Sequence, residues 1–323
     1  MCSSVEREPV LKETACPLCG GTSCHVIERV AMADVARLYR KLNVTVEDRG
    51  ELEYMECGDC SLRFFNPIIT GNEAFYARLQ NNDWYYMEQK PEYETSLKWL
   101  PREGKILEVG AGEGAFSRYC GTDRYVGLEF NKQAIESAGR KGIRLYHETI
   151  EQHAGKSPAT YSAVVMFQVL EHAASPGAFL SSAIDTLADG GLLIIAVPSE
   201  DGFLGEVINN PLNMPPHHVT RWPDRVLRNL ETILPIKLVA ISHEPVASFH
   251  QHYFRRTRMN IRLRKIMGMQ RRLVDTSIMA TVVQKCASLL SLLIREDPSG
   301  HKGHTVIGVY EKRAGEKKGA RIL

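Results

Sequence analysis

Residues 106–116 read ILEVGAGEGAF, an apolar run that leads into glycines at Gly110, Gly112 and Gly114. Glycines packed this closely between a strand-like run and a helix-like run let the backbone approach a ligand, with N–H groups and a helix start facing it. The pattern therefore indicates a nucleotide-like ligand. Because Gly110-x-Gly112-x-x-Ala115 also satisfies the dinucleotide fingerprint, the loop by itself leaves a dehydrogenase open as well.

Strand-like and helix-like segments alternate from residue 105 onward. Such alternation is typical of a mostly parallel sheet with helices on both faces, in which ligands bind beyond the carboxyl ends of the strands. We therefore predict an α/β fold with a doubly wound, mostly parallel sheet of seven strands. The expected strands are 105–109, 124–128, 143–147, 162–167, 191–197, 236–242 and 304–311.

Composition sets outer limits on the class of protein. The 323 residues suffice for one α/β domain and a small accessory module, and 44% hydrophobic with 24% charged residues is ordinary for a globular protein. A net charge of +2 argues neither for nor against a polyanionic partner. The start MCSSVEREPVLKET lacks a basic-then-apolar signal pattern, so we expect a reducing, cytoplasmic location and metal binding in preference to disulfides.

Four cysteines form two C-x-x-C pairs, in CPLCG and CGDC. Two such pairs suit one tetrahedral Zn²⁺ with every position filled, which makes the metal structural. The pairs lie farther apart than usual, and ADVARLYRKL (33–42) looks like a helix inserted between them. Cys24 and His25 are competing ligands. The expected ligands are Cys16, Cys19, Cys57 and Cys60.

The ends of the expected strands carry the next signals. Glu129 ends the second strand, where a carboxylate can accept hydrogen bonds from both ribose hydroxyls of NAD or of S-adenosylmethionine. The segments MFQVLEHAASPGAFL (166–180) and ADGGLLIIAVP (188–198) follow. With Glu108 before the glycine turn, these features resemble, in this order, the class I S-adenosylmethionine-dependent methyltransferases, whose sheet is Rossmann-like.

The resemblance extends to both sides of this core. A four-cysteine ribbon, an aromatic bridge and PPHHVTRW (215–222) are similar to the zinc-ribbon-bearing methyltransferases akin to the sugar C-methyltransferases and the ubiquinone-biosynthesis type. The likeness covers about residues 16–245 and part of the last strand, GHTVIGVYEKR. One departure is Ser162, where family members usually carry an aspartate at the start of the fourth strand.

The resemblance implies a set of cofactor contacts. The backbone around the glycines would meet the methionine part, Glu129 would hold the ribose, and Phe130 would flank the adenine. Glu108 would either pin the loop or contact the methionine ammonium. The implied cofactor residues are Glu108, Gly110, Gly112, Gly114, Glu129, Phe130, Thr149 and Ile150 near the adenine edge, and Gln168 at the methyl-donor end.

Methyl transfer from a sulfonium needs alignment above all. Orientation can contribute roughly 7–11 kcal/mol, whereas a general base contributes about 10²–10⁴-fold. Candidates for a base are His172 with its neighbour Glu171, and the pair His217 and His218 in a proline-rich rim loop. In the sugar C-methyltransferase relatives an acid precedes a histidine here, so His217 departs from the pattern and His218 keeps it. Glu171 and His172 have the alternative role of fixing the loop after the fourth strand.

A basic stretch, YFRRTRMNIRLRKIMGMQRRL (253–273), precedes an apolar stretch at 277–294. The first reads as an amphipathic basic helix interrupted near Gly268, and the second as a buried or interfacial helix. A solvated face is the plain interpretation. The functional alternatives are peripheral contact with an anionic membrane through 251–294, a phosphorylated substrate, and, third, nucleic acid.

These patterns predict an S-adenosylmethionine-dependent methyltransferase with a structural zinc. It would act on a small-molecule or sugar-derived acceptor. Phosphorylated and lipid-linked acceptors belong to this class. The alternative is a zinc-ribbon protein that binds nucleic acid or modifies RNA. The acceptor, the choice among C-, O- and N-methylation, and the oligomeric state stay open.

In the aromatic bridge (67–100), Tyr85 or Tyr86 is a candidate for a lid, against the alternative that the bridge only packs on the main domain. The same patterns divide the chain into five parts. The parts are 1–66 (zinc-ribbon module), 67–100 (aromatic bridging helices), 101–250 with 301–313 (S-adenosylmethionine-binding domain), 251–300 (basic and apolar helical insertion before the last strand) and 314–323 (disordered tail).

Overall fold

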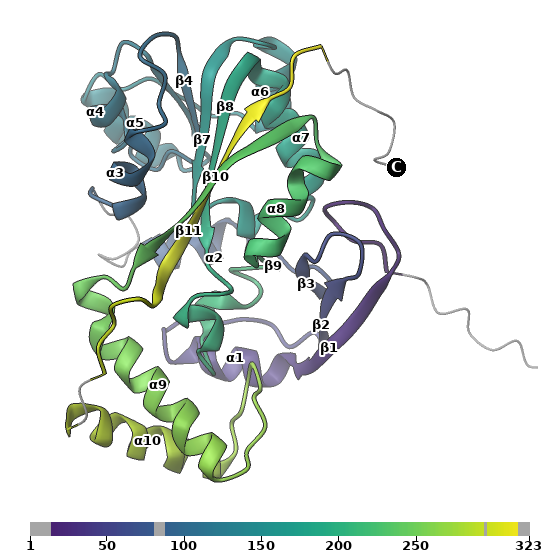
Figure 1. Ribbon diagram of the computed structural model, residues 1–323, viewed down its shortest axis with the longest axis vertical. Coiled ribbons are helices and arrows are strands. Elements are labelled where there is room, and N and C mark those ends of the chain that lie inside the picture. Colours follow the sequence, from purple (N-terminus) through teal and green to yellow (C-terminus); the bar gives the residue numbers. More distant parts are fainter. Residues whose placement is uncertain (1–13, 81–87, 294–295, 316–323) are drawn as a thin grey trace, which may run out of the picture.

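A computed structural model describes residues 14–80, 88–293 and 296–315 of the protein (Figure 1). Its main sheet has seven strands in the order β10-β11-β8-β7-β4-β5-β6. Neighbouring strands from β8 to β6 are parallel, and β11 runs antiparallel to both β8 and β10. The predicted mostly parallel seven-stranded sheet is thereby confirmed. The strands are β4 (Ile106–Val109), β5 (Tyr125–Leu128), β6 (Leu145–Tyr146), β7 (Tyr161–Phe167), β8 (Leu187–Pro198), β10 (Ile236–Pro245) and β11 (Lys302–Lys312).

Both faces of this sheet are covered because its central strands are apolar on both sides. In β4, Leu107 and Val109 join one buried cluster, and Ile106 joins the cluster on the opposite face. Helices α3 and α4 pack on the Ile106 side, and α6, α7 and α8 on the other (Figure 1). The helices around the sheet are α3 (Pro91–Leu97), α4 (Ser117–Cys120), α5 (Lys132–Arg140), α6 (Ile150–Lys156), α7 (Pro176–Thr186) and α8 (Asp224–Ile233).

A second sheet of four strands holds the N-terminal part, in the order β1-β2-β3-β9. Strand β9 comes from a distant part of the chain and pairs with β3 through Arg63 with Arg221 and Phe64 with Thr220. The sequence reasoning missed this strand, since two residues carry no readable alternation. Its elements are β1 (Cys24–Ala31), α1 (Met32–Arg40), β2 (Glu51–Cys57), β3 (Arg63–Asn66), α2 (Glu73–Gln80) and β9 (Thr220–Arg221).

A buried ionic cluster locks this joint. The guanidinium of Arg221 lies 3.2 Å from one oxygen of Glu200, and that of Arg63 lies 3.1 Å from the other. The Tyr54 hydroxyl donates to Glu200 at 3.2 Å. Glu200 and Arg221 are buried, so each charge depends on the other for compensation. The cluster therefore fixes the segment that contains His217 and His218.

The basic stretch forms α9 (Gln251–Ile266), which packs on α10 (Ile278–Leu293). Arg258 pairs with Glu206 and Glu296, and Arg264 pairs with Asp275. These ion pairs compensate part of the basic charge of the insertion. Side chains of α10 that stay exposed are Ile278, Met279, Val282, Leu289, Leu292 and Leu293.

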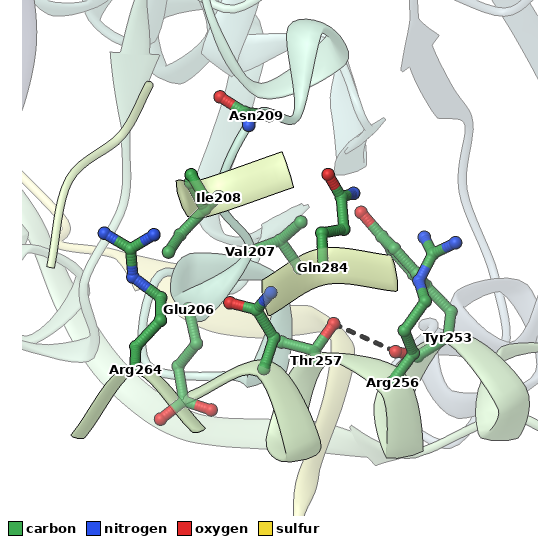
Figure 2. Close-up of a pocket in the computed structure, with 11 residues that line it drawn as sticks. Glu206, Val207, Ile208, Asn209, Tyr253, Arg256, Thr257, Arg264 and Gln284 are labelled. Atoms are coloured by element: carbon green, nitrogen blue, oxygen red, sulfur yellow. Dashed lines mark hydrogen bonds between the residues drawn. The ribbon is translucent and has the colours of Figure 1, made fainter. Parts of the chain in front are cut away.

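Between α9, α10 and the segment around Glu206 lies a small cavity of about 70 Å³ (Figure 2). In it, the Thr257 hydroxyl donates to the Tyr253 carbonyl at 2.9 Å, which is a bond within α9 itself.

Among the described residues, none of the helices is long and apolar enough to cross a membrane. The short 3₁₀ helices are η1 (Leu170–His172), η2 (Phe203–Glu206), η3 (Pro211–Asn213) and η4 (Ser248–His250). The lid candidates Tyr85 and Tyr86, and tail residues 316–323, lie outside the described residues.

Candidate functional site

A cavity of about 960 Å³ opens at the carboxyl ends of the parallel strands. The loops after β4 and β7 line it, as does Pro198 at the end of β8. This is the edge at which ligands of open α/β sheets bind. The volume lies at the upper end of the usual range for small-molecule sites, which leaves room for a nucleotide-like ligand together with a second molecule.

The glycine loop forms one wall of the cavity. Gly110 has a φ of +73°, and a Cβ there would lie 2.4 Å from Val169 Cγ2. A side chain at this position is therefore excluded both by backbone conformation and by the wall behind it. Gly112 has a φ of +53° and donates its N–H to Glu129 Oε2 at 2.7 Å. The loop presents backbone to the cavity, as the sequence predicts.

Glu129 lies at the tip of β5 and lines the cavity. Its Oε1 accepts hydrogen bonds from the N–H groups of Phe130 and Asn131, each at 2.8 Å. Together with the bond from Gly112, these contacts turn the carboxylate toward the glycine loop. A carboxylate oxygen can accept further bonds, so Glu129 can still receive hydroxyl donors from a ligand.

Gln168 follows β7 in a left-handed conformation, with a φ of +58°. Residues other than glycine rarely adopt this region, and they do so mainly where the surrounding structure imposes it. Its side-chain amide donates to the Thr305 hydroxyl at 3.3 Å, and both residues line the cavity. The expected cofactor residues that line the cavity are Gly110, Gly112, Gly114, Glu129 and Gln168.

Four other expected cofactor residues lie outside this lining. Glu108 is buried and accepts a hydrogen bond from Tyr125, and burial raises the pKa of its carboxyl to about 8. Phe130 is 61% exposed, and Ile150 is buried in the core. Thr149 caps α6 by accepting from Gln152 N–H at 3.1 Å. Their contacts with a cofactor stay predictions.

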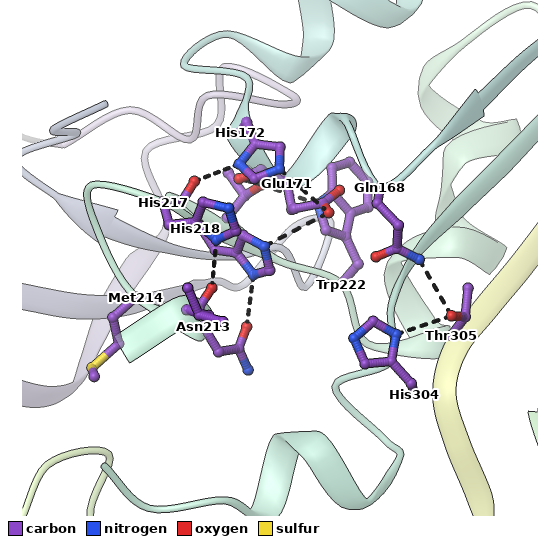
Figure 3. A network of polar contacts seen from close by, with 12 residues as sticks. Gln168, Glu171, His172, Asn213, Met214, His217, His218, Trp222, His304 and Thr305 are labelled. Carbon is purple, nitrogen blue, oxygen red and sulfur yellow. Dashed lines mark hydrogen bonds and ion pairs between the residues drawn. The ribbon is translucent and has the colours of Figure 1, made fainter. Parts of the chain in front are cut away.

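Three histidines and one glutamate converge on another part of the same cavity (Figure 3). Glu171 and His172 end η1, whereas His217 and His218 precede β9. Val219 N–H donates to the Glu171 carbonyl at 3.0 Å, which holds the two segments side by side. One ligand nitrogen from each histidine lies within 4.8 Å of the other two.

Backbone carbonyls orient two of these rings. His172 Nδ1 lies 2.5 Å from the His217 carbonyl, and His217 Nδ1 lies 2.9 Å from the Leu212 carbonyl. Because a carbonyl only accepts, both Nδ1 atoms carry the proton and both Nε2 atoms present a lone pair. Burial lowers the pKa of His172 to about 4 and that of His217 to about 3, and it also lowers the pKa of His218. These rings are therefore neutral near pH 7.

His218 Nδ1 lies 3.1 Å from the side-chain amide of Asn213. In one orientation of that amide its oxygen accepts from His218, and in the other its nitrogen donates to His218 while its oxygen accepts from Arg221. The free nitrogen of His218, Nε2, faces Glu171 in both cases, 3.8 Å from Oε1.

Glu171 is only 1% exposed, and neither carboxyl oxygen has a hydrogen-bond partner among the described residues. His172 Nε2 lies 3.7 Å from Oε1, beyond hydrogen-bond range. Burial raises the pKa of Glu171 to about 8. A carboxyl left without partners beside nitrogen lone pairs can hold a proton or a cation.

Sequence reasoning missed a pair of neighbouring carboxyl groups in the cavity, those of Glu92 and Glu244. Burial, together with the neighbouring Glu92 carboxyl, raises the pKa of Glu244 to about 8. Glu244 ends β10, a strand parallel to β4, so its position at a strand end was the available signal. Glu92 is in a bridging helix, and its spacing carried no such signal.

The four predicted cysteine ligands form a cluster. The Sγ atoms of Cys16 and Cys60 lie 3.6 Å apart, as do those of Cys19 and Cys57. A disulfide needs about 2.05 Å, whereas a tetrahedron with metal–sulfur bonds of about 2.3 Å has edges of about 3.8 Å. The cluster therefore suits a metal ion. The competing Cys24 donates to the Gly21 carbonyl, and His25 is exposed.

Two basic side chains of the ribbon are paired with carboxylates. Arg29 pairs with Glu53, and Arg37 pairs with Asp34. Tyr39 is fully buried and donates to the Met214 carbonyl, so its ring is not available for stacking on a base.

Comparison with known proteins finds a match for the central part of the chain. Residues 84–234 match a family model described as a methyltransferase domain. The chain contains a methyltransferase domain. An uncharacterized protein of Methanocaldococcus jannaschii is 27% identical over 128 residues, covering 39% of this chain and 61% of that protein.

A ubiquinone biosynthesis O-methyltransferase of Caulobacter sp. (strain K31) is 30% identical over 105 residues, covering 30% of this chain and 42% of that enzyme. The methyltransferase domain thus matches these curated relatives over about half of their length. A crystal structure of a SAM-dependent methyltransferase from Archaeoglobus fulgidus superposes with a TM-score of 0.48 at 13% identity, covering 73% of this chain and 100% of that one.

Proposed function

We propose that the protein is an S-adenosylmethionine-dependent methyltransferase that acts on a small molecule. One observation carries the proposal: a single cavity, within and beside the residues that match the family model, is lined both by the glycine loop with Glu129 and by the Glu171–histidine cluster. The first set suits a nucleoside with a charged tail. The second set suits an acceptor that must lose a proton.

On this proposal, the backbone at Gly110 and Gly112 receives the methionine part of the cofactor, with Gly114 beside it. Glu129 accepts hydrogen bonds from the ribose hydroxyls, which its position at the tip of β5 supports. Gln168 borders the methyl group. We assign Phe130, Thr149 and Ile150 to the adenine side, and Glu108 to the support of the glycine loop through Tyr125.

The reaction is an in-line displacement at carbon. An acceptor atom forms a bond to the methyl carbon, the carbon–sulfur bond breaks, and the sulfonium leaves as a neutral thioether. The acceptor's proton passes to an imidazole of the cluster formed by His218, His217, His172 and Glu171, where the Nε2 lone pairs of His172 and His217 can receive it. Alignment of the two molecules in the cavity supplies most of the rate acceleration.

The position of Arg256 is an argument for an acceptor that carries negative charge. It lines the cavity and lies over the Tyr253 ring at 5.0 Å, without an ion-pair partner among the described residues. A phosphorylated or otherwise anionic small molecule would complement the charge of Arg256, and the sequence patterns predict that this molecule is sugar-derived.

Zn²⁺ is our assignment for the cysteine cluster. Membrane contact through 251–294 and a cytoplasmic location stay predictions.

Titration calorimetry with S-adenosylmethionine and with S-adenosylhomocysteine tests the cofactor assignment. We expect both to bind the full chain at one site, and NADH to leave both the heat and the melting temperature unchanged. Stabilisation by NADH with no heat from either sulfur nucleoside would overturn the proposal. A library of phosphorylated and neutral hydroxyl compounds with labelled cofactor then identifies the acceptor class, with Arg256→Ala expected to raise KM for anionic acceptors.

A further inference from the structure

We propose that His172, His217 and His218, with Glu171, form a binding site for a divalent transition-metal ion at the wall of the cavity. This site is separate from the cysteine cluster, and it goes beyond the proposed methyl transfer because ion binding does not require the cofactor.

The first support is convergence of ligand atoms. One nitrogen from each of the three histidines lies within 4.8 Å of the other two, and Figure 3 shows the rings gathered around Glu171. Metal–nitrogen bonds of about 2.0–2.1 Å place ligands on a tetrahedron about 3.3–3.4 Å apart. Small side-chain rotations therefore suffice to close the set around an ion.

The second support is how the rings are held. Histidines that bind metals usually donate the other ring N–H to a carbonyl, a carboxylate or a water molecule, which fixes the tautomer and aims the lone pair. His172 and His217 each have such a carbonyl partner. For His218, the Asn213 orientation that also accepts from Arg221 leaves the ring proton on Nε2, so binding an ion there requires the amide to turn and that proton to move to Nδ1.

The third support is Glu171, which points to a ligand independently of the histidines. Both of its carboxyl oxygens are buried and unpartnered among the described residues, and Oε1 lies 3.7 and 3.8 Å from Nε2 of His172 and of His218. A native structure rarely leaves two such acceptors without a partner. A cation between the carboxylate and the imidazoles satisfies them and compensates the buried charge.

The set of donors indicates the class of ion. Imidazole nitrogens with one carboxylate suit Zn²⁺, Fe²⁺, Co²⁺ or Ni²⁺ and not the oxygen-preferring Mg²⁺ or Ca²⁺. Because all four residues line the cavity, an ion there would face the space for the second molecule. It could coordinate an oxygen of that molecule and lower its pKa, in which case the histidines act as ligands instead of free bases.

Cobalt(II) titration of the metal-stripped full chain tests this site, because Co²⁺ reports its ligands by absorption. We expect one equivalent with the near-ultraviolet charge-transfer band of thiolate ligation, from the cysteine cluster. A second equivalent should show only the weak visible bands of nitrogen and oxygen ligation. His217→Ala and His218→Ala should each lose the second spectrum and keep the first, which also reports that the variant is folded.

Two further variants separate ligation from a general disturbance of the cavity. Glu171→Gln keeps the shape of the side chain, and we expect it to weaken the second Co²⁺ site roughly tenfold or more. His250→Ala is the matched control, since His250 lines the same cavity outside the cluster and should leave both spectra unchanged.

The proposal is overturned if the wild-type chain shows no second spectrum at millimolar Co²⁺, or if His217→Ala and His218→Ala both retain it. Calorimetry with S-adenosylmethionine on the same samples keeps the two proposals apart. If the wild-type chain shows the second Co²⁺ spectrum but does not bind S-adenosylmethionine, the methyltransferase function alone is refuted. If it binds S-adenosylmethionine but shows no second Co²⁺ spectrum, the metal site alone is refuted.

Discussion

Replacing Glu129 by alanine should weaken S-adenosylmethionine binding by at least about 100-fold. Two ribose hydroxyls would each donate to the carboxylate, and a hydrogen bond to a charged group contributes about 1.5–3 kcal/mol. Their joint loss is therefore at least about 3 kcal/mol, which is about two decades in Kd. The Gly112 N–H also loses its 2.7 Å acceptor, so the loop becomes less ordered and the loss increases.

The measurement is titration calorimetry of S-adenosylmethionine and of S-adenosylhomocysteine with Glu129→Ala and with a control, Glu136→Ala. Glu136 lies exposed on α5, so the control removes the same charge from the neighbouring helix without touching the cavity. Both nucleosides should weaken equally in Glu129→Ala, because the carboxylate contacts the ribose and not the sulfonium. An unchanged Kd in a variant that melts like the wild type would refute the role assigned to Glu129.

Three further predictions concern stability. Because the pKa of Glu108 is about 8 in the fold and near 4.5 when unfolded, the native state holds an extra proton between these values. The free energy of unfolding should thus fall by up to about 1.4 kcal/mol per pH unit as the pH rises from 5 to 8, and urea denaturation should give a flatter profile for Glu108→Gln. Glu200→Ala leaves Arg221 buried without its carboxylate and should cost about 3–5 kcal/mol, read from urea midpoints; a loss below about 1 kcal/mol would contradict the buried-pair argument. Cys57→Ser should abolish zinc binding by the cysteine cluster and lower the melting temperature, measured by metal analysis and calorimetry, and unchanged metal content would exclude this cluster as the site.

Several features were readable from the sequence because they are local. Buried strands show as apolar runs, and the glycine turn, the C-x-x-C pairs and the acid at the end of β5 each depend on a few neighbouring residues. The expected strands accordingly match β4 to β8, β10 and β11, although β8 begins at Leu187, earlier than expected. The cofactor assignments of Phe130 and Thr149 came from the resemblance alone, and the structure places neither side chain in the lining of the cavity.

The sequence by itself determined the sheet, the glycine loop and the four clustered cysteines, since short-range periodicity and spacing encode them. Only the tertiary structure decided that Glu171 and His172 meet His217 and His218, and that β9 joins the ribbon to the methyltransferase domain. Contacts between distant segments depend on how loops are packed and on buried ion pairs such as Glu200 with Arg221, which leave no periodic trace in either segment. The burial of Glu171, whose carboxyl oxygens have no hydrogen-bond partner among the described residues, is likewise a property of the packed interior. This burial makes the cluster a candidate for binding a proton or a metal ion.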